Sequence, residues 1–304
     1  MHSGIGPRAQ LEQFAIPLVL DQPSIGQNLR DHNLCPLVYA RSPGSTDRGP
    51  FYGDQVAMDA ALDQWKRDGT GPWAKFACEL GIGFFKLDHL PSTAEFNALP
   101  PREQAHLSAP TVPHYEILTH APMHWLIPDF PRDSLNYACL VVFPYNNQAR
   151  GAATLQSADP RAPLRFDPRF LSHPFDRRVA VDALRAALRM ARHEGFARDS
   201  VATLAGPPGE GEGGDGDDSD EALLAYWRQT VSSGWHMTGT VRMGRAGQQD
   251  DAAVDSEFRL VGVEGLRVAD MSVVPVLPSG HKQAVAYVTG MTCAEKMIAE
   301  YGLA

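Results

Sequence analysis

Two histidines, His236 and His281, have the surroundings expected of side chains that act on a ligand. His236 lies in SGWHMTGTVRMG and His281 in LPSGHKQA, so each is flanked by small, turn-forming residues and not by an apolar helical face. Imidazole is the side chain whose ordinary pKa lies closest to 7, which suits it to accept or donate a proton. The two rings could therefore share one site, and two separate structural histidines are the alternative interpretation.

The segment between the histidines must set the distance between them. Residues 266–270 have the short apolar character of a buried strand, and Pro275 and Pro278 end regular structure on its far side. We therefore expect a rigid strand in this region, with the two imidazoles delivered from loops onto one site.

Three groups of residues resemble signatures of the glucose–methanol–choline (GMC) family of FAD-dependent oxidoreductases. The first is WHMTGTVRMG followed by VDSEFRLVGVEGLRVADMSVVPVLPSGHKQA. The second, at the other end of the chain, is SGIGP at residues 3–7 with PSIGQNLRDH at residues 23–32. The third combines Arg150 and Gly151 with SADP at residues 157–160 and DPRFL at residues 167–171. The resemblance thus covers both ends and the middle of the chain.

This resemblance implies an active site for oxidising a small-molecule alcohol by hydride transfer to FAD. His236 matches the family's catalytic base, and His281 matches a second position that is His or Asn among members. The hydroxyl proton must leave as the hydride departs, which is the work of such a base. The resemblance also implies FAD contacts from Asp270, Met271, Gly280, His281, Lys282 and Gln283, with no metal.

Lys282 is a departure from the family close to this site, because related members often carry a small polar residue there. A cation at this position could act on the flavin or simply point to solvent. A helix is expected to begin directly after residues 279–281, which would place its positive end near His281.

The glycine-rich unit that cradles the FAD pyrophosphate in the family is missing from this sequence. Met1 falls inside the signature that surrounds SGIG, and the unit precedes that signature in relatives. Gly209, Gly211 and Gly214 match G-x-G-x-x-G by letter, but the surrounding acidic residues would repel a pyrophosphate. We therefore expect a truncated or split enzyme, whose partner could be a separate N-terminal FAD-binding chain.

The composition bounds the remaining possibilities. The chain has 304 residues, 43% of them apolar, and a formal charge of −9. Residues 206–221 carry seven acidic groups and no basic one, so most of the net negative charge of the chain lies in this segment. We expect the segment to be a flexible, solvated linker. Nucleic acid is not expected as a partner, because the net charge is negative. A membrane is not expected either, because no run of about 18 apolar residues occurs.

Metal and disulfide chemistry are not indicated either. The four cysteines are far apart, with no metal-ligand spacing among them, and we expect free thiols. His120 and His124 have a helical ligand spacing, but Pro122 between them argues against a continuous helix.

The predicted fold class is α+β. Strands are expected over 114–119 and 136–145, with 152–157 as an antiparallel neighbour of the second, and helices over 58–67, 177–194, 221–228 and 284–301. Gly195 is the expected stop of the 177–194 helix.

The family resemblance implies a remnant of the FAD-binding domain at 1–33, a substrate-binding domain at 34–231 with an antiparallel sheet backed by helices, and a catalytic-histidine segment at 232–304 that completes the FAD-binding domain. Because that α/β domain is incomplete, we expect uncovered apolar faces, and with them poor solubility or association with a partner.

Two alternatives to alcohol oxidation remain open. The chain could be a flavin-free GMC homologue that uses its histidines for non-oxidative cyclisation or dehydration, or a remnant that binds without catalysis. Bulky aromatic side chains favour an aromatic or polyketide-like substrate over a sugar; they are Trp73, Phe84, Phe85, Trp125 and Trp235.

Overall fold

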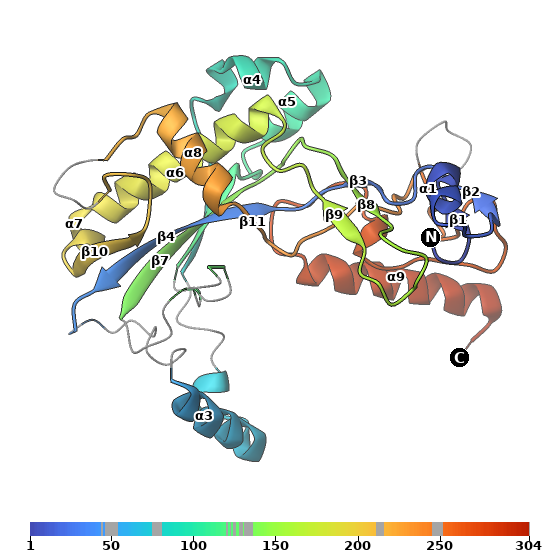
Figure 1. Cartoon of the computed structure of the whole chain (residues 1–304), viewed down its shortest axis with the longest axis horizontal. Helices are drawn as coiled ribbons and strands as arrows, with labels where there is room; N and C mark the ends of the chain where they lie inside the picture. Colours follow the sequence, from blue (N-terminus) through green and yellow to red (C-terminus); the bar gives the residue numbers. More distant parts are fainter. Residues whose placement is uncertain are drawn as a thin grey trace. The chain divides into compact units, whose positions relative to one another are not determined.

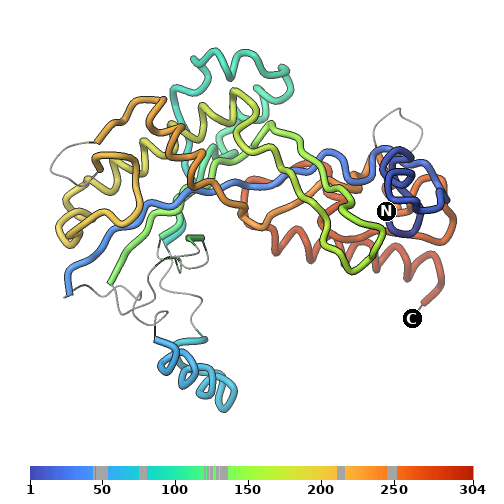
Figure 2. Tube along the Cα trace, viewed as in Figure 1, coloured from blue at the N-terminus to red at the C-terminus, as the bar shows by residue number. Residues whose placement is uncertain are grey.

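The structure, a computed structural model, describes residues 1–43, 45, 54–74, 81–119, 121, 123, 126–127, 130, 136–210, 216–244 and 252–303. The chain forms two compact units. Unit 1 comprises Met1–His32, Asn146–His173 and Ser233–Ala304, and unit 2 comprises Asn33–Tyr145 and Pro174–Ser232. Figure 2 shows how unit 1 gathers segments from the beginning, middle and end of the chain.

Unit 2 is built on an antiparallel sheet (Figure 1). Its strand order is β10 (Ser200–Ala205), β4 (Asn33–Arg41), β7 (Tyr137–Pro144), β6 (Tyr115–Thr119) and β5 (Ile82–Phe85). The central strand β7 reads YACLVVFP and is buried along its whole length, which explains its continuous apolar sequence. Strand β11 (Ser232–Ser233) pairs with β4 at the boundary between the units.

Helices cover one face of this sheet. Helix α6 (Pro174–Arg192) packs on β7, and α8 (Asp220–Thr230) packs on α6 and β4. Buried residues recur along α6 at helical spacing, as in Val179, Ala183, Ala187 and Ala191. The predicted antiparallel sheet backed by helices is therefore confirmed. Gly195 does not stop the long helix, since α6 ends at Arg192 and Gly195 lies inside the short helix α7 (Glu194–Ala197).

The remaining helical elements of unit 2 are short or peripheral. Helix α3 (Gln55–Asp68) contains the predicted 58–67 segment; it begins with Asp54 accepting a hydrogen bond from Ala57 N–H and ends at Gly69 in the left-handed conformation. The others are η1 (Pro72–Ala74), η2 (Leu90–Ser92), α4 (Ala94–Asn97) and α5 (Pro101–Ser108).

The acidic segment is not a freely solvated linker where the structure describes it. Arg192 of α6 contacts Asp218 at 2.8 Å and also pairs with Glu210, which is only 7% exposed. Arg185 and Arg178 contact Asp220 in the same way. The prediction failed because it weighed the acidic run alone, without the arginines that α6 presents to it. Gly211 and Gly214 lie outside the described residues.

Unit 1 contains small sheets and one long helix. Strands β1 (Ile5–Gly6) and β2 (Leu20–Asp21) pair in parallel around α1 (Arg8–Gln13). A second sheet has the order β3 (Gln27–Leu29), β8 (Gly151–Thr154) and β9 (Arg165–Asp167). The 3₁₀ turn η4 (Met271–Val273) and helix α9 (Gln283–Tyr301) complete it, and α9 ends at Gly302 in the left-handed conformation.

Two predicted strand assignments in unit 1 are wrong. Strand β8 does not pair with β7, because β4 and β6 already occupy both edges of β7, and β8 pairs with β3 and β9 instead. Residues 266–270 do not form a strand: only an isolated bridge joins Arg267 to Arg259, and Leu266 is 40% exposed. A single bridge leaves this segment without the ladder that defines a strand.

The compact units and the predicted domains differ in one respect. The predicted boundaries at 33/34 and 231/232 fall within a residue of unit boundaries, but residues 146–173 belong to unit 1 and not to the 34–231 segment. Compactness does not identify a bound ligand, so the substrate-binding role of 34–231 stays a prediction.

Candidate active site

Three histidines of unit 1 lie together. His32 Nδ1 and His236 Nδ1 are 3.0 Å apart and share a hydrogen bond. The His236 ring centroid lies 5.1 Å from that of His32 and 5.0 Å from that of His281, with an interplanar angle of 88° in each case. His236 is thus the middle ring of a row, and the predicted juxtaposition of His236 with His281 is present.

Asp31 holds the backbone of the His236 loop. Its carboxylate accepts hydrogen bonds from the His236 N–H at 2.8 Å and from the Ser233 hydroxyl. The Gly234 N–H donates to His32 C=O at 2.7 Å. Between these anchors Trp235 adopts a φ of +56°, a left-handed conformation that is rare for a bulky residue. These contacts perform the positioning that the sequence analysis assigned to a strand at 266–270.

His32 was not among the predicted site residues. Its sequence signal was present, since it ends the PSIGQNLRDH segment directly after Asp31, but that segment served only to establish the resemblance. The shared hydrogen bond between the two Nδ1 atoms allows one hydrogen between them. If His236 donates it, His236 Nε2 carries a lone pair and no hydrogen; if His32 donates it, His236 Nε2 carries the proton.

Burial sets the protonation of the row. It lowers the pKa of His236 to about 4, with further lowering from His281 and Lys282. It also lowers the pKa of His32 well below the ordinary value, again with Lys282, His236 and His281 acting in the same direction. Burial raises the pKa of Asp31, although the bonds from Ser233 and from the His236 N–H oppose this. At neutral pH, His32 and His236 are therefore uncharged and able to exchange hydrogen bonds.

Lys282 is buried and does not point to solvent. It is 7% exposed, and its ammonium donates to Pro278 C=O at 2.7 Å and to Gly280 C=O at 3.2 Å. Burial lowers its pKa to about 7, while Asp31 acts in the opposite direction. The Lys282 ammonium is thus hydrogen-bonded to the loop that carries His281.

The predicted FAD contacts form two groups in unit 1. Asp270 is exposed and accepts a hydrogen bond from Ser272 N–H at 2.7 Å, at the start of η4 that begins with Met271. Gly280, exposed His281, Lys282 and exposed Gln283 form the entry to α9, whose first N–H groups have no acceptor within the helix. A Cβ atom added at Gly280 would meet no atom within 4 Å, so the backbone there is open to a close approach.

Residues 280–283 fit the ring end of FAD. Backbone donors, an exposed imidazole and an open glycine suit the carbonyl groups of a flavin ring. Among the described residues, the segment closest to a phosphate cradle is β1 with Gly4 and Gly6 leading into α1. Its glycines are filled by the protein itself: a Cβ at Gly4 would lie 2.3 Å from Pro17 O, and one at Gly6 would lie 2.8 Å from Met1 Cγ.

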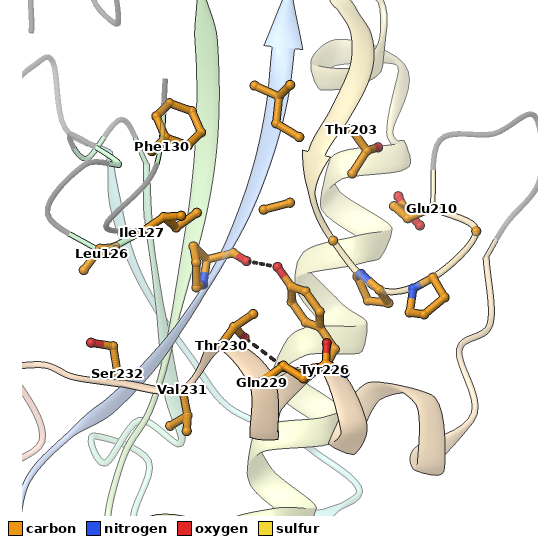
Figure 3. Close-up of a pocket in the computed structure, with 17 residues that line it drawn as sticks. Leu126, Ile127, Phe130, Thr203, Glu210, Tyr226, Gln229, Thr230, Val231 and Ser232 are labelled. Carbon is orange, nitrogen blue, oxygen red and sulfur yellow. Dashed lines mark hydrogen bonds between the residues drawn. The ribbon is translucent and has the colours of Figure 1, made fainter. Parts of the chain in front are cut away.

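Two cavities lie elsewhere, one in each unit. Unit 2 has a cavity of about 780 Å³, where Tyr226, Gln229 and Thr230 of α8 face Leu126, Ile127 and Phe130 (Figure 3). Unit 1 has a cavity of about 700 Å³ whose lining includes Asn28, Arg150 and Arg169. Neither is lined by His236 or His281.

The predicted aromatic residues line neither cavity. Trp235, next to His236, is 61% exposed, while Trp73, Phe84 and Phe85 of unit 2 are 40%, 52% and 38% exposed. Trp125 lies outside the described residues. Trp235 is thus the one member of this set that the structure describes beside the histidine row.

The described residues contain no group of three or more potential metal ligands, and His120 and His124 lie outside them. Cys35, Cys139 and Cys293 are buried free thiols, and Cys78 lies outside the described part. No described helix has the length and apolarity needed to span a membrane.

Residues 147–290 match the family model described as GMC oxidoreductase. The chain is 31% identical to patulin synthase from Aspergillus clavatus, over 94% of this chain and 44% of the relative. It is 30% identical to an oxygen-dependent choline dehydrogenase from Sinorhizobium medicae, over 100% of this chain and 50% of the relative. A formate oxidase structure from Aspergillus oryzae superimposes with a TM-score of 0.80 at 25% identity, covering 99% of this chain and 52% of the other.

The chain spans about half the length of the curated relatives it matches. The predicted resemblance is confirmed by sequence and by fold. Residues 147–290 therefore match the C-terminal domain of the GMC oxidoreductases, and the chain is similar to members of that family over almost its whole length.

Proposed function

We propose that this chain supplies the substrate-side histidines of a site that oxidises an alcohol by hydride transfer to FAD. The observation that carries the proposal is the row His32, His236 and His281, in which partly buried His236 stands between two other imidazoles. A base for an alcohol must be unprotonated before the reaction, and burial keeps His236 in that state at neutral pH.

His236 receives the hydroxyl proton on Nε2 in this proposal. That role requires the tautomer in which His236 Nδ1–H donates to His32 Nδ1, so His32 positions the base by fixing its hydrogen. His281, whose ring meets that of His236 edge to face, holds the same substrate oxygen and stabilises its developing negative charge. FAD, when bound, supplies the acceptor for the hydride.

The flavin ring is proposed to lie against residues 280–283, and the FAD phosphates on another polypeptide segment. This division follows from the fit described above: residues 280–283 offer suitable groups to the ring, whereas atoms of the protein itself lie against Gly4 and Gly6. We propose that a FAD-binding segment, on a separate chain or joined to this one, completes the cofactor site.

The exposed apolar side of α9 supports this proposal. Tyr287, Val288 and Met291 are 66%, 63% and 61% exposed, and Ile298 is 48% exposed. A helix with so much apolar surface is typical of one that is covered in its functional assembly. The exposed aromatic Trp235 beside the base is consistent with an apolar or aromatic alcohol as substrate.

The test is to measure flavin in the purified chain, with and without added FAD, and then after mixing with a GMC FAD-binding segment. We expect little FAD on the chain alone and alcohol-dependent bleaching of flavin absorbance in the mixture. Stoichiometric FAD on the chain alone would contradict the division of the cofactor site. Turnover without flavin that is lost in His236→Gln would favour the non-oxidative alternative.

A further inference from the structure

Lys282 occupies a position that is costly for a lysine. It is buried, and it is also the residue that precedes the first turn of α9, where the helix has its positive end. A cation at that end is unfavourable by roughly 0.3–1 kcal/mol, and burial of an ammonium costs more. Neither local helix stability nor solvation therefore explains a lysine here.

The ammonium ties together the loop that carries His281. Its two acceptors, Pro278 C=O and Gly280 C=O, bracket the turn directly before His281, and the Gly280 N–H donates back to Pro278 C=O at 2.9 Å. The Ser279 hydroxyl in this turn donates to Asn146 Oδ1 at 2.8 Å. The turn is thus held by two contacts, one from the Lys282 ammonium and one from the Asn146 side chain.

The charge of Lys282 is not cancelled by a direct ion pair. Among the described residues no carboxylate forms an ion pair with its ammonium, and the negative charge that raises its pKa is that of buried Asp31. The Asp31 oxygens already accept hydrogen bonds from Ser233 and from His236 N–H. The titratable groups that share this part of unit 1 with Lys282 are Asp31, His32, His236 and His281.

We propose that Lys282 is a positioning residue of the histidine site: its buried ammonium holds the turn before His281 and places a positive charge beside the row of histidines. This inference rests on the proposed role of His236 as the base. Because His236 titrates near pH 4 and Lys282 near pH 7, the lysine is a cation throughout the titration of His236. Its repulsion therefore disfavours the imidazolium over the whole of that range.

The experiment is an NMR titration of the imidazole resonances of the full chain, with His236→Gln to assign His236. Lys282→Gln removes the charge while keeping a donor for the turn, and Lys282→Arg keeps the charge. Lys296→Met is the matched control, since Lys296 lies on α9 in an ion pair with Glu257 at 2.7 Å. This titration needs neither flavin nor turnover, so its result is separate from the test of the proposed function.

We expect the pKa of His236 to rise by about one pH unit in Lys282→Gln and to stay unchanged in Lys282→Arg and Lys296→Met. An unchanged pKa in a folded Lys282→Gln protein would overturn the proposal. A rise in both Lys282→Gln and Lys282→Arg would also overturn it, because the charge would then not be the cause. Should Lys282→Gln not fold, Lys282→Met is titrated in its place with the same expectation.

Discussion

At the scale of single residues, the site depends on two imidazoles, those of His32 and His236, that burial keeps uncharged at neutral pH. His236 has two neighbouring rings, and only one hydrogen is available between it and His32. Chemistry at His236 Nε2 is therefore tied to a residue 204 positions earlier in the sequence. This arrangement makes separate predictions for His236 and His281.

Replacing His236 should remove proton transfer while leaving the fold intact. In the reconstituted mixture, His236→Gln is expected to slow alcohol-dependent flavin reduction by roughly 10²–10⁴-fold, the usual contribution of a positioned base. His281→Asn should lose much less, because an amide can still hold the substrate oxygen. Stopped-flow absorbance at several alcohol concentrations measures both. His106→Gln, an exposed helical histidine of unit 2, is the control, and an equal loss in that variant would refute the assignment.

Protonation of His236 should also destabilise the protein in acid. Its folded pKa is about 4 against an ordinary 6.5, so the unfolded chain binds more protons between those values. Stability from this group is present above pH 6.5 and is lost as the pH falls toward 4. After allowance for partial exposure, the free energy of unfolding should fall by about 1 kcal/mol between pH 7 and pH 5. Urea titrations at both values test this, and the fall should be smaller in His236→Gln.

At the scale of elements, helix α6 fixes the acidic segment through its arginines. Arg192 neutralises Glu210, whose side chain is nearly inaccessible, and also binds Asp218. Breaking such a pair leaves a charge without its partner in a poorly hydrated place. The segment is thereby tied to the helix that backs the sheet of unit 2.

Arg192→Met should therefore cost about 2–3 kcal/mol of unfolding free energy, because Glu210 loses its counter-charge. Arg161→Met is the control, since Arg161 and Asp159 are a solvent-exposed pair that is expected to contribute little to stability. Urea unfolding followed by tryptophan fluorescence gives both values. Equal effects in the two variants would show that the pairing of Glu210 is not stabilising.

The sequence predicted some of these elements and missed others for identifiable reasons. Helix α6 was predictable because its apolar residues repeat at three and four positions. Strand β4 was missed because it contains Pro36, which lacks the N–H that a strand interior normally donates. In the structure, β4 pairs with β10 only as far as Val38. The missing N–H of Pro36 therefore costs no hydrogen bond on the β10 edge of β4. His32 was missed because pairing across 204 residues leaves no local pattern.

At the scale of the whole molecule, this chain matches about half of its relatives' length, and α9 presents an apolar surface. The predicted association with a FAD-binding segment would cover that surface. The chain alone is therefore expected to self-associate or to require its partner for solubility.

The double variant Tyr287→Ser/Met291→Lys should weaken this association, because it places polar groups on the most exposed part of α9. We expect less co-purification with a tagged FAD-binding segment and a more monodisperse chain in light scattering. Glu295→Gln, also exposed on α9, is the control and should change neither readout. Undiminished association of the double variant would place the partner on another surface.

The assembly of unit 1 from three separated segments also has a kinetic consequence. The contact between His32 and His236 closes a loop of about 200 residues, most of which fold as unit 2. Contacts of such long range form late, because the chain must first lose the entropy of the intervening loop. During synthesis, unit 2 can fold while His281 is still inside the ribosome, whereas the histidine row cannot form until α9 has emerged. Slow translation before Ser233 would therefore favour folding, and the site itself should be the last part of the protein to acquire protection from hydrogen exchange.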